Sequence, residues 1–525
     1  MKVVTKVIKG QYHDSVSLML AARAIKESAG VADAAVVMGT EANKALLRQA
    51  GLLTREAAKA SADDLVISVK AEKGGESILE RADDFLAKKS VQSGEEGVST
   101  PQSVREAKQR YPGANVAVIS VAGAYAPREA REALAAGLHV LLFSDNVSMQ
   151  DEIALKRFAV EEGLLMMGPG AGTAILNGIG LGFANAVPSG PVGIVSAAGT
   201  GLQEVSCLLA KGGVGISQAI GIGGRDFSAR VGGLMAKAGL EALIADEATE
   251  LIILISKPAD ATVTAKLVEK LQGGNKPAIL CTLGAARKEK QEGSIYFTRT
   301  LEECAQTAIR LMGKDIPDYE TYRKESSQNL IELAGKLRKD LSGSQKYIRG
   351  LYSGGTLCYE AQVIWAEMLS KPVYSNAPLD KEFTLPAGEG HPFHTAIDMG
   401  EEEYTVGRPH PMIDNDLRSR FIISAGQDAS TAVIVLDVVL GFGVHPDPGA
   451  ELASAVKQAR KASQDAGRAL HVVASITGTE RDPQSLSGTE ESLKQAGVII
   501  CSSNARAARL AGFLVNENTG KSEAA

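Results

Sequence analysis

Two short glycine-containing segments constrain the fold of this chain most strongly. Ser196–Glu204 and Ser353–Glu360 each lie between a short apolar or strand-like run and a run with helical patterning. Glycine permits a tight strand-to-helix turn, and free N–H groups at a helix start can face a small anion. One helix end carries only about half a positive charge, so a single turn would bind weakly. If both helices point at one place, the sequence predicts a phosphate-sized anion held from two sides.

The predicted anion-binding residues come from these two turns and from a third glycine segment, which follows a strand predicted at 218–222. They are Gly199, Thr200, Gly201, Gly354, Gly355, Thr356, Gly223, Gly224 and Arg225. Each turn alone also fits an ordinary helix start with threonine as the N-cap, and Arg225 fits a strand-end turn closed by a salt bridge to Asp226. Asp145 and Asp437 stand at predicted strand ends, where α/β folds place ligands, or they cap turns.

Composition limits the class of protein. A chain of 525 residues with 45% hydrophobic residues is too long for one core and predicts several domains. The net charge of −6 and the lack of a basic cluster argue against nucleic acid as a partner. The first ten residues read as a strand and not as a signal sequence, and no apolar run is long enough to span a membrane. Five scattered cysteines fit a reducing compartment, so we expect a cytoplasmic protein.

Alternating strand-like and helical runs predict an α/β protein with several parts. The polar run at 90–103, rich in glycine and serine, predicts a flexible connector. The predicted parts are a small N-terminal α/β module (1–89), a Rossmann-like domain (104–188), a flavodoxin-like domain (189–315), an exposed helical connector (316–346), a second flavodoxin-like domain (347–515) and a loose tail (516–525). The sequence indicates no role for the first module.

Three blocks of motifs resemble known enzyme domains. Asn115–Thr173 resembles the CoA-binding half of the succinyl-CoA synthetase alpha subunit, and the motifs between Gly193 and Ser256 follow the order of that subunit's ligase domain. The motifs between Gly350 and Gly443 resemble the ligase domain of the beta subunit. The resemblance implies a fused alpha-like and beta-like pair of ligase domains, with no ATP-grasp domain visible. CoA is a candidate ligand, although a packed remnant of the domain would keep the same pattern.

Four further segments extend this resemblance to the FdrA family over nearly the whole chain. They are Asp14–Met19, Met38–Thr40, Tyr404–Asp414 and Thr477–Pro483. Members of that family are described as acyl-CoA synthetases, and one branch is understood as a subunit of oxamate carbamoyltransferase. That enzyme uses phosphate to cleave oxalurate into oxamate and carbamoyl phosphate.

The phosphoryl carrier of succinyl-CoA synthetase has no counterpart here. That enzyme uses a histidine in a Gly-His-Ala-Gly loop, steadied by a glutamate after a ligase-domain strand. In this chain no histidine follows Pro277 before His391, and Ser256-Lys257-Pro258 takes the place of the glutamate. The residues therefore favour direct transfer between phosphate and a carbonyl, with Lys257 as a cation beside the developing charge. Alternatively, Lys257 simply faces solvent.

A loop with two prolines carries the strongest constellation of side chains. Arg408 is suited to clamp a carboxylate with two hydrogen bonds, and His410 to move a proton near neutral pH. In the alternative interpretation, Arg408 pairs with Asp414 and His410 packs at a domain seam. His391 and His394 lack an obvious third ligand, so no metal site is predicted.

Three functions remain open at this stage. The leading prediction is carbamoyl or acyl transfer to or from phosphate, with Lys257, Arg408 and His410 as catalytic residues, phosphate or carbamoyl phosphate as substrate and no certain cofactor. The second is an acyl-CoA ligase subunit that requires an ATP-grasp partner chain. The third is a non-catalytic scaffold subunit that binds an anion or CoA. All three imply partner subunits, and none implies a membrane.

Overall fold

The computed structural model describes most of the chain, in two compact units. The described residues are 1–11, 15–26, 28–40, 43–44, 47–48, 50–72, 74–81, 101–285, 290–385, 393–405 and 409–516. One unit comprises Met1–Arg110 with Glu402–His410, and the other comprises Tyr111–Glu401 with Pro411–Ala525. The predicted connector at 90–103 and the predicted tail fall almost entirely outside the described residues. No helix in the described part of the chain is apolar over a length that would cross a bilayer.

The N-terminal unit contains a small antiparallel sheet in the order β1-β3-β2. Alternate residues of the central strand face opposite sides: Ile67 joins an apolar cluster with Leu18 and Ile25, whereas Val66 joins a second cluster with Leu52. The elements of this unit are β1 (Lys2–Ile8), α1 (Ser15–Lys26), β2 (Val31–Met38), α3 (Arg55–Lys59), β3 (Leu65–Ala71), α4 (Gly75–Glu80), α6 (Val104–Arg110) and α15 (Glu402–Thr405).

The second unit begins with a three-stranded parallel sheet in the order β4-β5-β6, as the Rossmann-like pattern predicts. Its helix α8 starts at Ser148, whose hydroxyl accepts the N–H of Asp151, an ordinary N-cap bond. The elements are β4 (Val116–Ile119), α7 (Ala126–Ala135), β5 (His139–Leu142), α8 (Met149–Glu161) and β6 (Met166–Met167).

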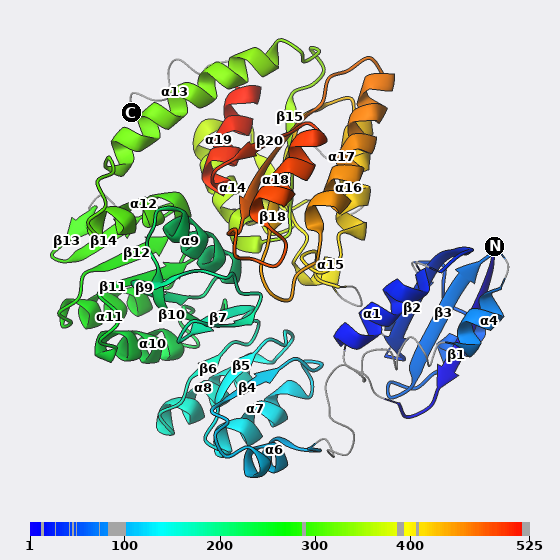
Figure 1. Ribbon diagram of the computed structural model, residues 1–525, viewed down its shortest axis with the longest axis horizontal. Coiled ribbons are helices and arrows are strands. Elements are labelled where there is room, and N and C mark those ends of the chain that lie inside the picture. The colour runs from blue at the N-terminus through cyan, green and yellow to red at the C-terminus, as the bar shows by residue number, and fades with distance from the viewer. Residues whose placement is uncertain are drawn as a thin grey trace. The chain divides into compact units, whose positions relative to one another are not determined.

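The region that resembles the alpha-type ligase domain, called the first ligase domain below, is built on an eight-stranded sheet in the order β13-β14-β12-β11-β9-β10-β7-β8. Helices α9 and α12 pack together on one face and α10 and α11 on the other (Figure 1). The elements are β7 (Thr173–Leu176), β8 (Ile179–Gly182), β9 (Ser189–Ser196), α9 (Gly199–Lys211), β10 (Ile216–Gly221), α10 (Leu234–Ala245), β11 (Leu251–Ser256), α11 (Ala261–Gln272), β12 (Ala278–Thr282), β13 (Gln291–Glu292), β14 (Ile295–Thr298) and α12 (Leu301–Leu311).

The hairpin of β7 and β8 was not predicted, although its signal is present. Asn177 and Gly178 both have positive φ angles, of 51° and 77°, as a tight two-residue hairpin turn requires. The hairpin pairs antiparallel with β10 and so extends the sheet of the first ligase domain.

The second ligase domain contains a fully parallel six-stranded sheet in the order β16-β17-β15-β18-β19-β20. Every residue of β18 is buried, as a continuous apolar run in a central parallel strand predicts. The elements are β15 (Tyr347–Tyr352), α14 (Gly355–Met368), β16 (Val373–Ser375), η1 (Lys381–Phe383), β17 (His394–Asp398), α16 (Asp416–Gln427), β18 (Thr431–Val439), α17 (Pro448–Asp465), β19 (His471–Thr477), α18 (Leu486–Gln495), β20 (Val498–Cys501) and α19 (Asn504–Val515).

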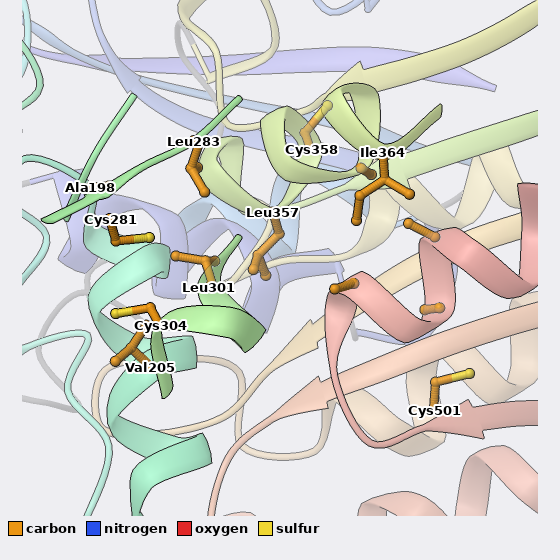
Figure 2. Packing of buried hydrophobic residues seen from close by; sticks show 14 of the residues in the cluster. Ala198, Val205, Cys281, Leu283, Leu301, Cys304, Leu357, Cys358, Ile364 and Cys501 are labelled. Atoms are coloured by element: carbon orange, nitrogen blue, oxygen red, sulfur yellow. The ribbon is translucent and has the colours of Figure 1, made fainter. Parts of the chain in front are cut away.

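The two ligase domains share one apolar core. The core takes residues from α9 and α12 of the first domain and from α14 and α19 of the second. Val205, Leu301 and Leu357 lie in this layer (Figure 2). Within this layer α9 and α14 contact each other.

The helix between the ligase domains is packed and not simply exposed. α13 (Tyr319–Arg338) buries Leu330 and Ala334 and contacts α19, and Nε of Arg338 donates to the carbonyl oxygen of Leu514 at 3.0 Å. The prediction of an exposed connector was wrong for the face of α13 that carries Leu330 and Ala334. A narrow apolar stripe within a densely charged helix was enough to bury one side.

Candidate functional site

The two glycine turns touch each other across the boundary between the ligase domains. A β-carbon added to Gly354 would lie 2.8 Å from Cγ2 of Thr200, and one added to Gly201 would lie 2.9 Å from Cγ2 of Thr356. These approaches are closer than ordinary van der Waals contact, so glycine is needed at both positions. The arrangement that the sequence suggested, with two helix starts at one place, is therefore what the structure shows.

Neither helix start has a side-chain cap from its own N-cap residue. The N-cap residues are Ala198 and Gly354, neither makes a side-chain capping bond, and neither helix has an acidic residue in its first turn. Thr200 and Thr356 are not the N-caps but the second helical residues, so the N-cap alternative is wrong. The first N–H groups of a helix have no partner within the helix, and the first residues, Gly199 and Gly355, are partly exposed. This arrangement suits one oxyanion.

The turn before α9 is held by its own serine. Oγ of Ser196 accepts the N–H of Ala198 at 3.0 Å and donates to the carbonyl oxygen of the same residue at 2.8 Å. Ser196 is almost fully buried. This support is local and uncharged.

The turn before α14 is held by a carboxylate from another strand. Asp437, in β18, accepts the N–H groups of Ser353 and Gly354 at 2.8 and 2.7 Å and the hydroxyl of Ser353 at 3.0 Å. Nη2 of Arg418 lies 2.6 Å from Oδ1 of Asp437 and also donates to the carbonyl oxygen of Leu351 at 2.8 Å. Both charged side chains are buried. Asp437 therefore caps the turn, which was one of the two roles open from the sequence.

A second carboxylate lies beside the same turn and was not singled out from the sequence. Asp398 ends β17 and is buried, and a β-carbon added to Gly355 would collide with its Oδ2. Oδ1 accepts the N–H of Gly400 at 3.0 Å. Burial raises the pKa of Asp398 to about 7, against the opposing charge of Lys257. The signal was present, because an acid at the end of an apolar strand stands where α/β folds place ligands.

Lys257 reaches from the first ligase domain toward the second. It follows β11 directly, is half-buried, and its Nζ lies 5.4 Å from the centre of the Tyr359 ring on α14. Its charge also acts on the pKa of Asp398. A cation and a carboxyl group of raised pKa thus flank the start of α14.

The third glycine segment lies beside the first turn, but its arginine points elsewhere. Gly224 lies near the carbonyl oxygen of Ala197, 3.8 Å from an added β-carbon. Nε of Arg225 contacts Oε2 of Glu152 at 2.7 Å, and Nη2 donates to the carbonyl oxygen of Val147. The ion pair offered from the sequence as the alternative role of Arg225 exists, with Glu152 as partner and not Asp226.

Lys156 completes that network. Its buried Nζ lies 2.8 Å from Oε1 of Glu152 and 2.8 Å from Oδ1 of Asp226. The network joins α8 of the Rossmann-like domain to the loop after β10 of the first ligase domain. Gly223, with a φ angle of +83°, packs against the Gly168–Pro169 backbone at the same junction.

The proline loop is described only in part. Arg408 and His391 lie outside the described residues. His410 is half-buried and belongs to the N-terminal unit, and burial lowers its pKa to about 4, so its ring is neutral near pH 7. His394 opens β17; its Nδ1 accepts the N–H of Ile348 at 3.2 Å, and burial lowers its pKa to about 4.

Two buried glutamates occupy equivalent positions in the helices that follow the two turns. Glu204 and Glu360 are each the sixth residue of their helix. Asn504 joins them, since its backbone N–H donates to Glu204 at 3.1 Å and its Nδ2 to Glu360 at 2.8 Å. Burial raises the pKa of both, that of Glu360 to about 7. The identical spacing in both segments was the signal that sequence reasoning missed.

Two family descriptions match parts of this chain. Residues 1–102 match the family described as AllF, heavy metal-associated domain, and residues 351–514 match the family described as CoA-ligase. The first match contains none of the five cysteines, all of which lie beyond residue 200. The second match runs from the last two residues of β15 into α19, and it includes the turn before α14.

Individual relatives extend the match to the full chain. The chain is 42% identical over 513 residues to the uncharacterized protein YahF of Escherichia coli K12, covering 97% of this chain and 98% of that protein. It is 30% identical over 168 residues to the succinate–CoA ligase [ADP-forming] alpha subunit of Aquifex aeolicus, covering 31% of this chain and 53% of that subunit. The chain thus spans about half the length of that subunit.

Among solved structures, the chain is similar to the dinucleotide-forming acetyl-coenzyme A synthetase 1 of Ca. Korarchaeum cryptofilum. The two are 16% identical, with a TM-score of 0.30, over 80% of this chain and 86% of that one. A TM-score of this size does not place the domains of the two chains in a common arrangement.

Proposed function

This chain belongs to the family of the Escherichia coli protein YahF, and we propose that it is a CoA-ligase-type enzyme subunit that transfers an acyl group to or from phosphate. The relatives support the ligase interpretation, which was the second of our predictions, better than the carbamoyl transfer that we placed first. The observation that carries the proposal is the contact at Thr200 and Gly354 between two helix starts whose N-cap residues make no side-chain capping bond.

In the proposed reaction, phosphate lies against the N–H groups at the starts of α9 and α14. An oxygen of phosphate attacks the thioester carbonyl of an acyl-CoA, the C–S bond breaks, and acyl phosphate and the CoA thiol are the products. Negative charge grows on the carbonyl oxygen in the transition state, where fixed N–H groups and the cation of Lys257 stabilise it. Asp398, with a pKa of about 7, exchanges the proton that the leaving thiolate takes up.

This chemistry uses no phosphohistidine. Among the described histidines of the second ligase domain, His394 and His471 open their strands, whereas the turn before α14 follows the end of β15. His445 follows β18, and its ring contacts Asp447 and Glu451. We therefore assign positioning, and not covalent catalysis, to the two turns. The formation of a thioester from a free acid would require a partner chain with an ATP-binding domain, and we place the reaction in the cytoplasm.

Carbamoyl transfer between oxalurate and phosphate is the second candidate. It is favoured by one observation, namely that the site brings together two helix starts, a carboxyl group and a lysine, with no covalent carrier among the residues that the structure describes. It would make this chain an FdrA-type subunit of oxamate carbamoyltransferase. None of the relatives above supports this finer assignment.

The test is an assay of the full chain, together with any chains that copurify with it. Acyl-CoA and phosphate are supplied, and acyl phosphate is trapped as the hydroxamate; oxalurate and phosphate are supplied in a parallel reaction. Phosphate-dependent hydroxamate from acyl-CoA supports the main proposal, and carbamoyl phosphate formed without CoA supports the second candidate. If neither forms and calorimetry detects no phosphate binding, both proposals are wrong.

A further inference from the structure

Each ligase domain places a buried glutamate at the start of the last helix of the other domain. Glu204 of α9 accepts the N–H of Asn504, the first residue of α19, at 3.1 Å, and it also accepts the hydroxyl of Thr477 in β19. Glu360 of α14 accepts the N–H of Leu301, the first residue of α12, at 2.7 Å. The first N–H groups of a helix have no partner within the helix. The two contacts are therefore reciprocal, and both lie at the boundary between the ligase domains.

The side chain of Asn504 joins the two glutamates into one cluster, called the Glu204–Asn504–Glu360 cluster below. Nδ2 of Asn504 donates to Oε2 of Glu360 at 2.8 Å and to the carbonyl oxygen of Leu357 at 3.0 Å. Leu357 belongs to the apolar layer that the two domains share (Figure 2). Oδ1 of Asn504 has no hydrogen-bond partner in the described structure, although the residue is fully buried. A buried acceptor without a donor is costly, so the cluster lacks at least one proton donor.

The cluster also lacks a cation in direct contact. Both glutamates are at most 2% exposed, and neither forms an ion pair with a residue that the structure describes. The charged or titratable groups that interact with them are Lys211 and Cys207 of α9, Glu302 of α12 and Tyr352 of β15. Of these, Glu302 is already paired with Arg509 of α19 at 2.6 Å. A carboxylate that is buried without a counter-charge tends to take up a proton.

The titration of the two glutamates agrees with this geometry. Burial raises the pKa of Glu360 to about 7, and the negative charge of Glu204 raises it further. Burial also raises the pKa of Glu204, although the charge of Lys211 opposes the change. When two acids interact in one site, the proton belongs to the pair and not to either residue.

We propose that the Glu204–Asn504–Glu360 cluster binds one proton from solvent, and that this proton couples pH to the packing of the two ligase domains. With the proton bound, one carboxyl group is neutral and the cluster gains a hydrogen-bond donor. With the proton released, two buried negative charges lie at the boundary and repel each other. The two glutamates lie in the helices whose starts form the candidate site, so the packing that the proton favours is the packing that brings the two glycine turns together.

The direction of the pH effect follows from the pKa of Glu360. Because this pKa, about 7 in the folded chain, lies above the ordinary value of 4.5, the proton stabilises the folded chain at low pH. The stabilisation is complete below about pH 4.5 and is lost as the pH rises through 7. The proposal does not depend on the group-transfer chemistry, and its test follows the titration alone.

Trp365 reports on the cluster directly. It is the only tryptophan of the chain, it lies in α14 with Glu360, and its Nε1 donates to the carbonyl oxygen of Ala508 in α19 at 2.8 Å. The experiment follows the fluorescence of the full-length protein from pH 5 to pH 9, with and without acrylamide as a quencher. We expect a transition with its midpoint near pH 7. Acrylamide should quench Trp365 more strongly on the alkaline side, because the boundary is packed less tightly there.

Four substitutions test whether the transition belongs to the cluster. Glu360→Gln is neutral at every pH and should abolish the transition and the change in quenching. Glu204→Gln should shift the midpoint to lower pH, because Glu360 then loses a neighbouring negative charge. Glu367→Gln is the matched control, since Glu367 is an exposed acid of the same helix, and Asp398→Asn is the second control, since Asp398 also has a raised pKa. Both controls should keep the midpoint of the wild type.

Circular dichroism and infrared spectroscopy keep the result interpretable if a variant is less stable. At pH 6 the carbonyl stretch of protonated carboxyl groups should be weaker in Glu360→Gln than in Glu367→Gln. If Glu360→Gln does not fold, the shift of the midpoint in Glu204→Gln decides the question. The proposal is wrong if the wild type shows no transition, if a folded Glu360→Gln protein keeps it, or if Asp398→Asn removes it. A transition without a change in quenching would contradict the coupling to domain packing.

Discussion

The two turns that meet at the candidate site share a sequence pattern but are supported differently. The turn before α9 is closed by the hydroxyl of Ser196, which bonds within three residues of chain. The turn before α14 is closed by Asp437, which lies on another strand and is paired with the buried Arg418. The first turn therefore depends on its own residues, whereas the second depends on the packing of its whole domain.

The first residues of α9 and α14 also have different surroundings, neutral in α9 and charged in α14. The atom nearest to a β-carbon added to Gly199 is the neutral Oγ1 of Thr173, at 3.7 Å, whereas one added to Gly355 would collide with the Asp398 carboxylate. Charge and titration are thus concentrated on the second turn. In the proposed site, the first turn would therefore supply only N–H groups, whereas the second carries the groups that are expected to respond to pH and to substitution.

The largest expected effect concerns Asp437. Asp437→Asn leaves the Arg418 guanidinium buried without its counter-charge and should reduce the free energy of unfolding by about 3–5 kcal/mol. Ser196→Ala removes one hydroxyl from the first turn and should cost only about 0.5–1.5 kcal/mol. Urea unfolding of both variants measures the difference. Equal losses would mean that the two turns are supported equally and would remove the basis of the comparison.

The next effect is a pH dependence that belongs to the second turn. The pKa of Asp398, about 7 in the folded chain, lies above its ordinary value of 3.8. Its contribution to stability is therefore complete below about pH 4 and is lost as the pH rises through 7. Asp398→Asn should remove at most about 2–3 kcal/mol of the decline in stability between pH 5 and pH 7.

Urea unfolding of Asp398→Asn and of the wild type at pH 5, 6, 7 and 8 provides the measurement. The other buried acids, such as Glu360, are present in both proteins, so the difference between the two curves isolates Asp398. Parallel curves would contradict the assignment.

Alanine substitutions at the first helical residue of α9 and of α14 should have different effects on stability, of intermediate size. Gly355→Ala forces a methyl group against the carboxylate of Asp398. It should lower the free energy of unfolding by about 1–3 kcal/mol, as overpacking does, and it should also abolish phosphate binding. Gly199→Ala has room for the methyl group and should stay within about 0.5 kcal/mol of the wild type. Unfolding and phosphate calorimetry on the pair provide the check; a Gly355→Ala protein that binds phosphate normally would exclude the start of α14 from the site.

A small expected effect on stability concerns Lys257. Lys257→Met keeps most of the side-chain volume but removes the cation near Tyr359, which should cost about 0.5–1 kcal/mol. Phosphate affinity should fall and become less sensitive to salt, because one cation no longer contributes. An unchanged affinity and an unchanged salt dependence would return Lys257 to the solvent-facing role that the sequence left open.

Much of the fold was legible in the sequence because parallel strands in an α/β protein are short, continuous apolar runs. β11 and β18 follow such runs closely, and the glycine turns mark where their neighbours β9 and β15 lead into helices. The sequence predicted an anion site only if the two turns lie together. It did not predict the contact itself, because that contact depends on how the two domains pack against each other.

The remaining parts of the site depend on contacts that no local pattern encodes. Asp398 acquires its raised pKa through burial, and Gly355, which lies against its carboxylate, precedes it by a whole crossover connection. Arg225 was offered as an anion ligand, but its nearest acid, Glu152, comes from a different domain. The single stripe that packs α13 against α19 was hidden by the charge around it.

The most direct test of the central claim is a crystal structure of the full chain with inorganic phosphate. The account predicts one phosphate between residues 199–201 and 355–357, with its oxygens accepting backbone N–H groups from both α9 and α14. Phosphate bound to one helix start alone, or no phosphate at these residues at a concentration where calorimetry shows binding, would contradict it.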